Sequence, residues 1–540
     1  MKWIISVANF LKAYYSISPK KKSLEQIERE KYLYKKIPFS RYMIIPCAFA
    51  VQLCCGSLYS WSVFNIPIEH ELNLTEGKTS ITFYIAVGIF GFSAAASGPC
   101  LEMYGPCRTL LASCLFIISG LLISALSIYL KCIALLYVGY GVLCGMGFGI
   151  AYLTPIAPLQ KWFPSKKGML SGIAVCGFGG GSMASAQLAA YLITKIGVSM
   201  SFVVLTAIIL LIMIPSSFIL RTPPGPSEAR SKNECLKDIK SVLKGSAETT
   251  DLVDEENIEV KLEENTCQIN KFIQYIESKT INMEFIEALK TREFIFMYLT
   301  LLANSCFGIL IISKLQDIAI QQFGVSYELA THTVSVNSFF NLLGGLVYGA
   351  LSDIIGQRPL LITSLGSQIV IAAVTPYLLQ KEGFWAFMVL MWALSSFYGG
   401  GFGIMPAFLN EMFGSKNLDA LHGVILTSWS LVGVVGGIVF SLIYKMEVDK
   451  GTPVKHRYDI NLYWICCLTS FGLIGCLFIR TNQRDRLMPP IVGQLARLRI
   501  HNNLLRLQWV SKKKDDIEWE EYCKCMLEKI KLGQLEVCNS

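Results

Sequence analysis

The chain contains one short motif twice, and both copies keep the same spacing between their glycines and carboxylate. Each copy has a glycine, a carboxylate four residues later, a second glycine three residues after that, and then an arginine. The first copy is Gly98, Glu102, Gly105 and Arg108, and the second is Gly349, Asp353, Gly356 and Arg358. Glycine lets helix ends approach closely, while the charged groups suit the point where a helix leaves lipid for water. We predict that these residues act in conformational gating of a duplicated membrane protein.

The duplication extends well beyond this motif. The first three members of the two copies are 251 residues apart, and Leu170-Ser-Gly returns as Leu421-His-Gly at the same offset. Gly147-Phe-Gly-Ile returns at 401–404, and Phe163-Pro-Ser-Lys returns as Phe413-Gly-Ser-Lys, at offsets within a few residues of 251. Small insertions between such matches belong in loops, so the two halves are expected to be parallel structural repeats.

The composition places most of the chain in lipid. Hydrophobic residues make up 53% of the sequence, whereas charged residues make up only 16%, which is far from soluble norms. About twelve apolar runs are each long enough to cross a bilayer, for which roughly 20 residues are needed. These runs are 41–66, 79–101, 108–130, 133–155, 168–193, 199–220, 294–316, 328–351, 359–380, 384–408, 420–444 and 461–479. We predict an all-α membrane protein with twelve transmembrane helices in two six-helix bundles.

The distribution of charge predicts the orientation and the domain plan. Lysines and arginines cluster between Lys20 and Arg41 and again beyond residue 480, so both termini are expected in the cytosol. The net charge of +9 then comes from basic residues at the cytosolic face of the membrane. No nucleic acid is therefore expected as a partner. The sequence does not distinguish the plasma membrane from an organelle membrane. The expected domains are a cytosolic segment 1–40, a bundle 41–220, a cytosolic linker 221–290, a second bundle 291–480, and a basic tail 481–540.

Two shorter segments outside the apolar runs have an amphipathic pattern. Residues 283–290 at the end of the linker predict a short surface helix. Residues 492–509 in the tail predict an interfacial helix, with leucines and arginines on different faces. A role in regulation or membrane anchoring is one hypothesis for the tail, and a solvated tail is the alternative.

Motifs for chemistry on a bound substrate are missing from the sequence. There is no nucleotide-binding loop with Lys-Ser/Thr, no His-Glu-x-x-His and no Gly-x-Ser-x-Gly. The cysteines show no zinc spacing, and most lie inside apolar runs, where cysteine packs as a small apolar residue. We therefore expect neither an enzyme nor a cofactor or metal, and the lipid bilayer and a small-molecule substrate are the expected partners.

Polar and aromatic residues inside the apolar runs are the candidate substrate-binding residues, because lipid makes polar groups costly. They are Tyr59, Trp61, Tyr152, Gln187, Lys314, His332, Asn337, Asn341 and Trp429. The two asparagines are equally suited to hydrogen bonds between helices and to substrate contacts. Lys314 either supplies a cation to a carboxylate or pairs with Asp317, one turn further on.

Several of these features together resemble a known family of carriers. The twelve runs, the duplicated motif and the glycine-rich fourth run resemble the major facilitator superfamily. Within it, Tyr59-Ser-Trp-Ser-Val-Phe, Pro155-Ile, Lys161-Trp-Phe-Pro-Ser-Lys-Lys-Gly and Gly172-Ile-Ala-Val-Cys-Gly-Phe-Gly resemble the oxalate/formate antiporter-like and monocarboxylate transporter branches. The resemblance implies a rocker-switch carrier of small organic anions, with its site at mid-membrane between the two halves.

The chain departs from this pattern at two positions. The resemblance implies an arginine after the Asn-x-x-Gly of the eighth run and a lysine in the eleventh, where this chain has Gly345 and Trp429. With both cations missing, a monocarboxylate such as pyruvate or lactate is expected rather than oxalate, and Trp429 is expected to shape an apolar wall. Amino acids or other small metabolites, or a membrane sensor that no longer transports, are the alternatives. A co-transported proton would travel with the substrate or through His332; uniport and exchange remain equally open.

Overall fold

The computed structural model describes residues 13–15, 28, 40–74, 78–223, 283–381, 383–481, 486–488, 498–500, 503–505, 509–510 and 512–531. Most of the predicted N-terminal segment 1–40 and of the predicted linker lies outside the described residues. Within the described part, ten helices are long and apolar enough to cross a membrane. The prediction of a helical, multi-pass membrane protein is confirmed, although the number of such helices is ten rather than twelve.

Two of the ten helices are far longer than one crossing requires. Helix α5 (Ser80–Tyr129) has 50 residues and α9 (Lys167–Ile219) has 53, which correspond to about 75–80 Å against a hydrocarbon core of about 30 Å. Each contains one glycine with non-helical backbone angles, Gly105 with φ +77° and Gly197 with φ +79°. Glycine reaches a positive φ at no steric cost, so the chain bends at these two points.

The first half of the chain forms one group of helices. Its elements are α3 (Ile44–Gly56), η2 (Ser57–Trp61), α4 (Ser62–Leu72), α5, α6 (Ile133–Leu136), η3 (Tyr137–Cys144), α7 (Gly145–Leu153), α8 (Ile156–Trp162) and α9, preceded by the short η1 (Arg41–Met43). Helix α4 ends at Asn73, which adopts the left-handed conformation with φ 53°. Asparagine tolerates this conformation better than most residues and is a common helix end.

The second half forms a second group, which begins at the end of the linker. Its elements are α12 (Phe285–Lys290), α13 (Arg292–Phe323), α14 (Tyr327–Ile355), α15 (Gln357–Gln380), α16 (Phe384–Phe413), α17 (Leu418–Leu431), η4 (Val432–Gly436), α18 (Gly437–Asp449), η5 (Val454–His456) and α19 (Asp459–Phe478). The side chains of Thr291 and Ser326 cap α13 and α14 by accepting bonds from Phe294 N and Leu329 N. Helix α12 lies within the segment 283–290 for which a surface helix was expected.

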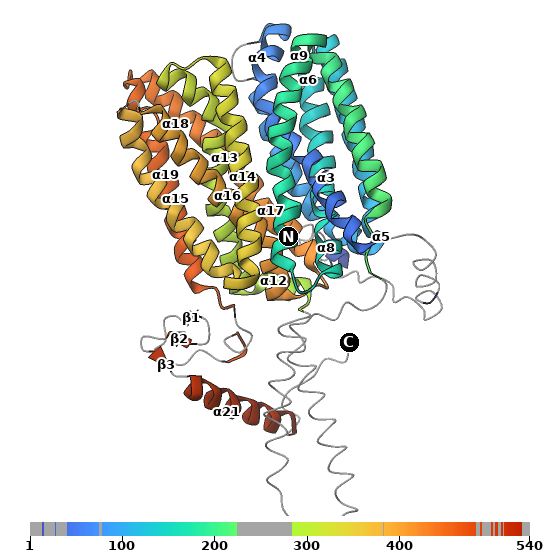
Figure 1. Cartoon of the computed structure of the whole chain (residues 1–540), viewed down its shortest axis with the longest axis vertical. Coiled ribbons are helices and arrows are strands. Elements are labelled where there is room, and N and C mark those ends of the chain that lie inside the picture. Colours follow the sequence, from blue (N-terminus) through green and yellow to red (C-terminus); the bar gives the residue numbers. More distant parts are fainter. Residues whose placement is uncertain are drawn as a thin grey trace, which may run out of the picture.

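The two groups lie side by side and meet along α9 with α14 and α5 with α17 (Figure 1). Glycines of the duplicated motif allow this close approach. A Cβ on Gly98 of α5 would lie 2.5 Å from Ala420 Cα of α17, and a Cβ on Gly349 of α14 would lie 2.8 Å from Gly172 Cα of α9. A Cβ at such distances would force the backbones apart, so Gly98 and Gly349 each let a helix of one half contact the backbone of the other.

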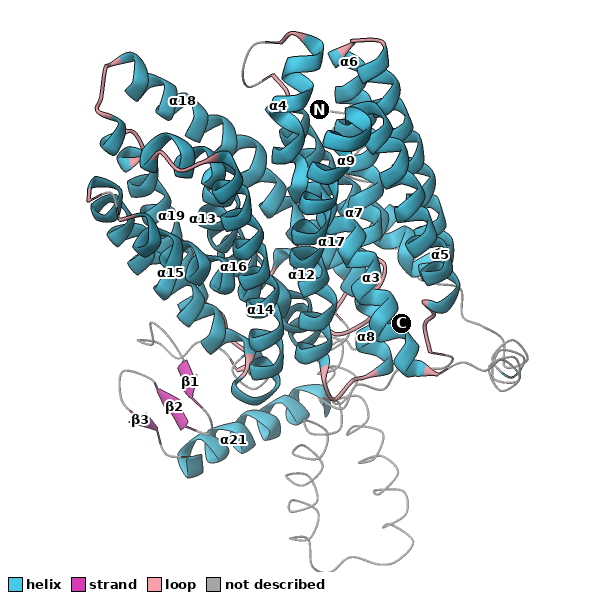
Figure 2. Cartoon of the chain, turned by 45° about the horizontal axis from the view of Figure 1, so that its top comes forward, coloured by secondary structure: helices cyan, strands magenta, loops and turns pink. Residues whose placement is uncertain are grey.

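The tail contains strands where a helix was expected. Strands β1 (Leu498–Ile500), β2 (Asn503–Leu505) and β3 (Trp509–Val510) form an antiparallel sheet in the order β1-β2-β3, followed by α21 (Lys512–Lys531). Figure 2 shows this sheet in magenta beside α21. At the described residues 498–500, 503–505 and 509 the prediction of an interfacial helix is therefore wrong, while the rest of 492–509 lies outside the described residues. Asn502 and Asn503 interrupt the leucine pattern, and asparagine favours turns over helix interiors.

Candidate functional site

The carboxylate of the second motif copy joins the two halves at the face of the molecule where α12 lies, which we call the linker face. Asp353, near the end of α14, accepts hydrogen bonds from Gly168 N at 2.8 Å and from Met169 N at 2.9 Å. These amides belong to the first turn of α9, where four backbone N–H groups lack helical partners and the helix dipole is positive. An aspartate of one half thus caps a helix of the other half.

The first motif copy repeats this arrangement with the halves exchanged. Glu102 of α5 faces the backbone amide of Ala420, in the first turn of α17, and lies close to Asp419. Gly105 and Gly356, which are equivalent in the two copies, both have positive φ, +77° and +94°. The two copies therefore bend the chain in the same way just after the carboxylate, although Glu102 Oε1 has no hydrogen-bond partner among the described residues.

The two arginines of the motif differ in burial. Arg358 is buried and donates to Leu477 O at the end of α19, within its own half. Arg108 is exposed. The predicted role of the two arginines in conformational gating stays a prediction.

Further polar contacts, which sequence reasoning missed, complete the seal at the linker face. Lys167 Nζ donates to Asn410 Oδ1 at 3.0 Å across the seam, and within the first half Gln160 Nε2 donates to Ser171 Oγ at 2.6 Å. Lys167 and Ser171 lie on α9, whereas Asn410 lies on α16 of the other half. The linker face is thus held closed by hydrogen bonds as well as by glycine contacts.

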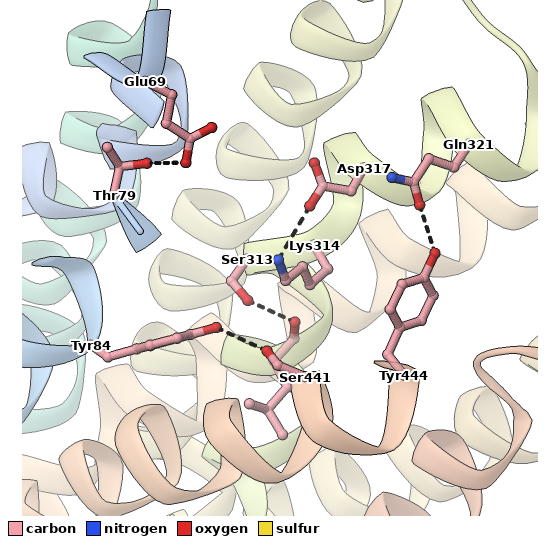
Figure 3. A network of polar contacts seen from close by, with 10 residues as sticks. Glu69, Thr79, Tyr84, Ser313, Lys314, Asp317, Gln321, Ser441 and Tyr444 are labelled. Atoms are coloured by element: carbon pink, nitrogen blue, oxygen red, sulfur yellow. Dashed lines mark hydrogen bonds and ion pairs between the residues drawn. The ribbon is translucent and has the colours of Figure 1, made fainter. Parts of the chain in front are cut away.

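The opposite face of the molecule is open. A vestibule of about 1430 Å³ lies between α4 and α5 on one side and α13 and α18 on the other. Figure 3 shows polar contacts around it: Lys314 Nζ and Asp317 Oδ2 form an ion pair at 3.3 Å, and Tyr444 Oη donates to Gln321 Oε1 at 2.9 Å. Tyr84 of the first half reaches Ser441 of the second, with the two oxygens 3.4 Å apart. The structure therefore has the two halves apart on one face and together on the other.

A smaller cavity of about 110 Å³ adjoins the vestibule and lies between the two halves. Both halves line it, through η2, α4, α5 and α9 on one side and α13, α14 and α16 on the other. Five of the predicted substrate-binding residues line it, namely Tyr59, Trp61, Lys314, Asn337 and Asn341. Lys314 also lines the vestibule, and it is the only lysine, arginine or histidine among the described residues that line the smaller cavity.

Three buried polar atoms of this central cavity have no hydrogen-bond partner among the described residues. They are Asn65 Oδ1, Asn337 Oδ1 and Ser395 Oγ. Asn337 is 1% exposed and Ser395 is fully buried. Buried polar atoms without a partner are costly in a folded protein, and their convergence on one cavity indicates a place where water or a ligand completes their hydrogen bonds.

Three aromatic side chains form the floor of the central cavity. Tyr59 Oη and Tyr398 Oη are 2.7 Å apart, and Trp429 Nε1 donates to both, at 3.1 and 3.0 Å. Beyond the floor lies a void of only about 20 Å³, lined by Tyr152 and Trp429 among others. Tyr59 belongs to the first half, while Tyr398 and Trp429 belong to the second, so the floor closes across the seam. Sequence reasoning missed Tyr398, because the sequence does not show which way a tyrosine in an apolar run faces.

Two predicted substrate-binding residues lie outside these three cavities. His332 of α14 is exposed, whereas Thr333 and Asn337 of the same helix are buried. Gln187 of α9 donates to Ser335 Oγ at 2.6 Å and so joins the halves instead of facing a cavity. Neither residue is brought to the site in this conformation. Trp61 lines the central cavity at its edge, but its Nε1 donates to Thr79 O, and its ring packs on Tyr140 at 4.2 Å.

This fold and this paired arrangement of halves are those of a membrane carrier. The sequence profile of the Major Facilitator Superfamily matches residues 48–437 and 294–487. The chain belongs to the Major Facilitator Superfamily.

Among its relatives are carriers of small carboxylates. The chain is 22% identical to monocarboxylate transporter 14 of Homo sapiens over 474 residues, covering 81% of this chain and 89% of the relative. It is 21% identical to the oxalate:formate antiporter of Oxalobacter formigenes over 393 residues, covering 72% and 82%. A solved structure of the proton:xylose symporter XylE bound to 6-bromo-6-deoxy-D-glucose shares the fold, with TM-score 0.55 and 15% identity over 81% of this chain and 95% of the other.

Proposed function

We propose that the protein is a secondary or facilitative transporter of small organic anions, most specifically of monocarboxylates such as pyruvate or lactate, that works by rocker-switch alternating access. One observation carries the proposal. A cavity lined by both halves and holding a single lysine opens toward one face, while the linker face is sealed. Separation of the halves at the linker face, with closure of the vestibule, would pass a bound molecule across the membrane.

The bound carboxylate would be held by Lys314 at the neck between the vestibule and the central cavity. Its ammonium group has three donors, of which one is directed at Asp317. Asp317 is half exposed toward the vestibule, its side chain being 52% accessible, so it can turn to solvent when a substrate carboxylate takes its place. Tyr59, Asn337 and Asn341 would contact the substrate, and Tyr152 and Trp429 would line its path after the floor opens.

We also propose the topology that this mechanism requires. If α5 and α9 each cross the bilayer twice, with bends at Gly105 and Gly197, the ten helices make twelve crossings in two bundles, 41–220 and 291–480. The basic segments that flank the apolar runs support a cytosolic location of both termini and the linker, and the vestibule would then face away from the cytosol. Glu102 and Asp353 would then stabilise the outward-facing state, with their neighbouring glycines allowing the contact.

Counterflow in liposomes tests the transport proposal directly. The purified full-length chain is reconstituted into vesicles loaded with unlabelled lactate or pyruvate, and labelled substrate is added outside. A carrier accumulates label transiently and saturably, and empty vesicles serve as the control. If substrate binds with no accumulation of label, the protein is a membrane sensor with the carrier fold instead.

A second candidate substrate class follows from the charge balance of the cavity. Lys314 and Asp317 both line it and carry opposite charges 3.3 Å apart. A zwitterionic amino acid matches this pair without displacing either charge, because its carboxylate and ammonium groups can contact one residue each. Counterflow with alanine in place of lactate distinguishes the two classes.

A further inference from the structure

The central cavity has more acceptor groups than a simple keto acid can satisfy. Asn65 and Asn337 line it, and in each case the amide oxygen has no partner among the described residues. Whichever way such an amide is turned, it presents one oxygen that needs a donor and one NH₂ group that needs an acceptor. Pyruvate has three oxygens that only accept hydrogen bonds, so it leaves both amide oxygens unpaired.

The position of these groups relative to Lys314 determines which chemical groups a ligand must carry. Lys314 lies on α13, Asn337 on α14, Ser395 on α16 and Asn65 on α4, so the cation and the amides approach one cavity from different helices. The volume of about 110 Å³ suits a molecule of only a few heavy atoms. A carboxylate at Lys314 therefore leaves its neighbouring carbon as the group that reaches the amides and the Ser395 hydroxyl.

We propose that the preferred substrate is a short monocarboxylate whose second carbon carries a hydrogen-bond donor, a hydroxyl or an ammonium group, and that Asn337 and Ser395 select for this donor. This inference rests on the proposed function, since it assumes that the central cavity is the transport site. A buried site built for a hydrogen-bonding group discriminates against the analogue that lacks it, because the site's own polar groups are then left unpaired.

Three compounds with the same three-carbon skeleton test the proposal. Lactate, alanine and pyruvate carry a hydroxyl, an ammonium and a carbonyl group, respectively, at the second carbon. In competition against labelled lactate counterflow by the full-length protein, we expect lactate or alanine to inhibit at a concentration roughly tenfold or more below that of pyruvate. The stronger of the two identifies the donor. If pyruvate inhibits as strongly as lactate and alanine, the inference is overturned, whereas the transport proposal stays intact.

Two variants and an adjacent control assign the selection to named side chains. Asn337→Leu keeps the size of the side chain without its amide, and Ser395→Ala removes the unpaired hydroxyl. Each should bring the inhibitory concentrations of lactate and pyruvate to within a few-fold of one another, chiefly by weakening lactate. Ser396→Ala is the matched control, because the Ser396 hydroxyl is bonded to Phe340 O and Trp392 O and does not line the cavity; it should keep the preference. If all three variants keep it, selection lies elsewhere; if no compound is exchanged by the wild type, the transport proposal itself fails.

Discussion

Asn410 Nδ2 donates a hydrogen bond to Gln160 Oε1 at 2.5 Å, across the seam between the two halves. The two residues are 250 positions apart, the same offset as between Phe163 and Phe413 three residues further along. They are therefore equivalent positions of the duplicated unit that contact each other. Phe178 and Trp429, which are 251 positions apart, both line the small void below the floor.

The proposed rocker-switch motion requires two halves that can exchange their roles, and the duplication supports it. Asp353 at the start of α9 and Glu102 at the start of α17 are equivalent contacts, yet only the first forms two hydrogen bonds that the structure describes. Equivalent helices can exchange the roles of hinge and contact when the halves rotate, because each half offers nearly the same surface to the other.

Neutralising Asp353 should slow transport more than it weakens binding. Asp353→Asn replaces two charge-assisted bonds to the first turn of α9 by weaker ones, a loss of about 1 kcal/mol or roughly fivefold in the population of the closed linker face. Kinetics of counterflow at equal protein amounts measure the maximal rate and the half-saturating concentration separately. Glu102→Gln should act in the same direction with a smaller effect. An unchanged maximal rate in both single variants and in the double variant contradicts the gating role.

Adding one methyl group at Gly98 should destabilise the closed linker face. A Cβ there would lie 2.5 Å from Ala420 Cα, which forces the two helices apart. Gly98→Ala should therefore increase the labelling of single cysteines introduced at the linker-face ends of α5 and α17 by a membrane-impermeant reagent, several-fold relative to the unsubstituted glycine.

Gly366 of α15 provides the control for this substitution. Apart from its chain neighbours and the backbone of its own helix, no atom lies within 4 Å of a Cβ built on it, and its backbone is helical. Gly366→Ala should leave the labelling unchanged, and its stability should be equal or slightly higher, since alanine favours helices. Equal labelling in the Gly98 and Gly366 variants would show that the close contact does not hold the face closed.

Charge at position 314 should be required for carboxylate transport. Lys314→Gln removes the only cation among the described cavity residues and should reduce uptake at least tenfold, because the carboxylate then enters the membrane interior unpaired. Lys314→Arg should retain part of the activity, since the charge remains while its geometry changes. Equal loss in both variants, together with a lowered melting temperature, would instead assign Lys314 a structural role as the partner of Asp317.

Removing the floor should connect the central cavity with the void beneath it. Cys176 lines that void and is buried below Tyr59, Tyr398 and Trp429. In a chain that retains Cys176 as its single cysteine, Tyr398→Ala should speed its modification by a small thiol reagent added from the vestibule side by about tenfold or more. Tyr377→Ala, which removes an exposed tyrosine of α15, is the control. No acceleration by Tyr398→Ala would mean that this aromatic cluster is not the barrier.

Oxalate should compete poorly. A dianion at mid-membrane needs two compensating cations, because an unpaired charge there costs several kcal/mol. Gly345 packs against Cys176 and Trp429 hydrogen-bonds two tyrosines, so neither position supplies a cation. Half-inhibitory concentrations for oxalate should exceed those for lactate by roughly tenfold in counterflow at neutral pH. Tighter inhibition by oxalate would require a second basic residue at the site.

The sequence by itself determined the duplication, the helical membrane class and the family. It also identified Asp353, whose place at a helix end follows from its motif, and Lys314, since a lysine inside an apolar run is rare enough to be noticed. These features depend on local composition and on spacing along the chain. Wherever the helix finally packs, a motif glycine still permits a close approach and the carboxylate after it still suits a helix end.

Only the tertiary structure decided which side chains meet in the cavity. The sequence analysis did not predict that Asn65, Ser395 and Tyr398 line the cavity. It did predict His332 and Gln187, which lie elsewhere. In a soluble helix the polar face marks the outside, but in a membrane both the lipid-facing and the buried faces are apolar. The pattern along α14 or α16 therefore does not fix the rotation of the helix about its own axis. That rotation is set by backbone contacts between the halves, such as those at Gly98 and Gly349, which exist only once both halves have folded.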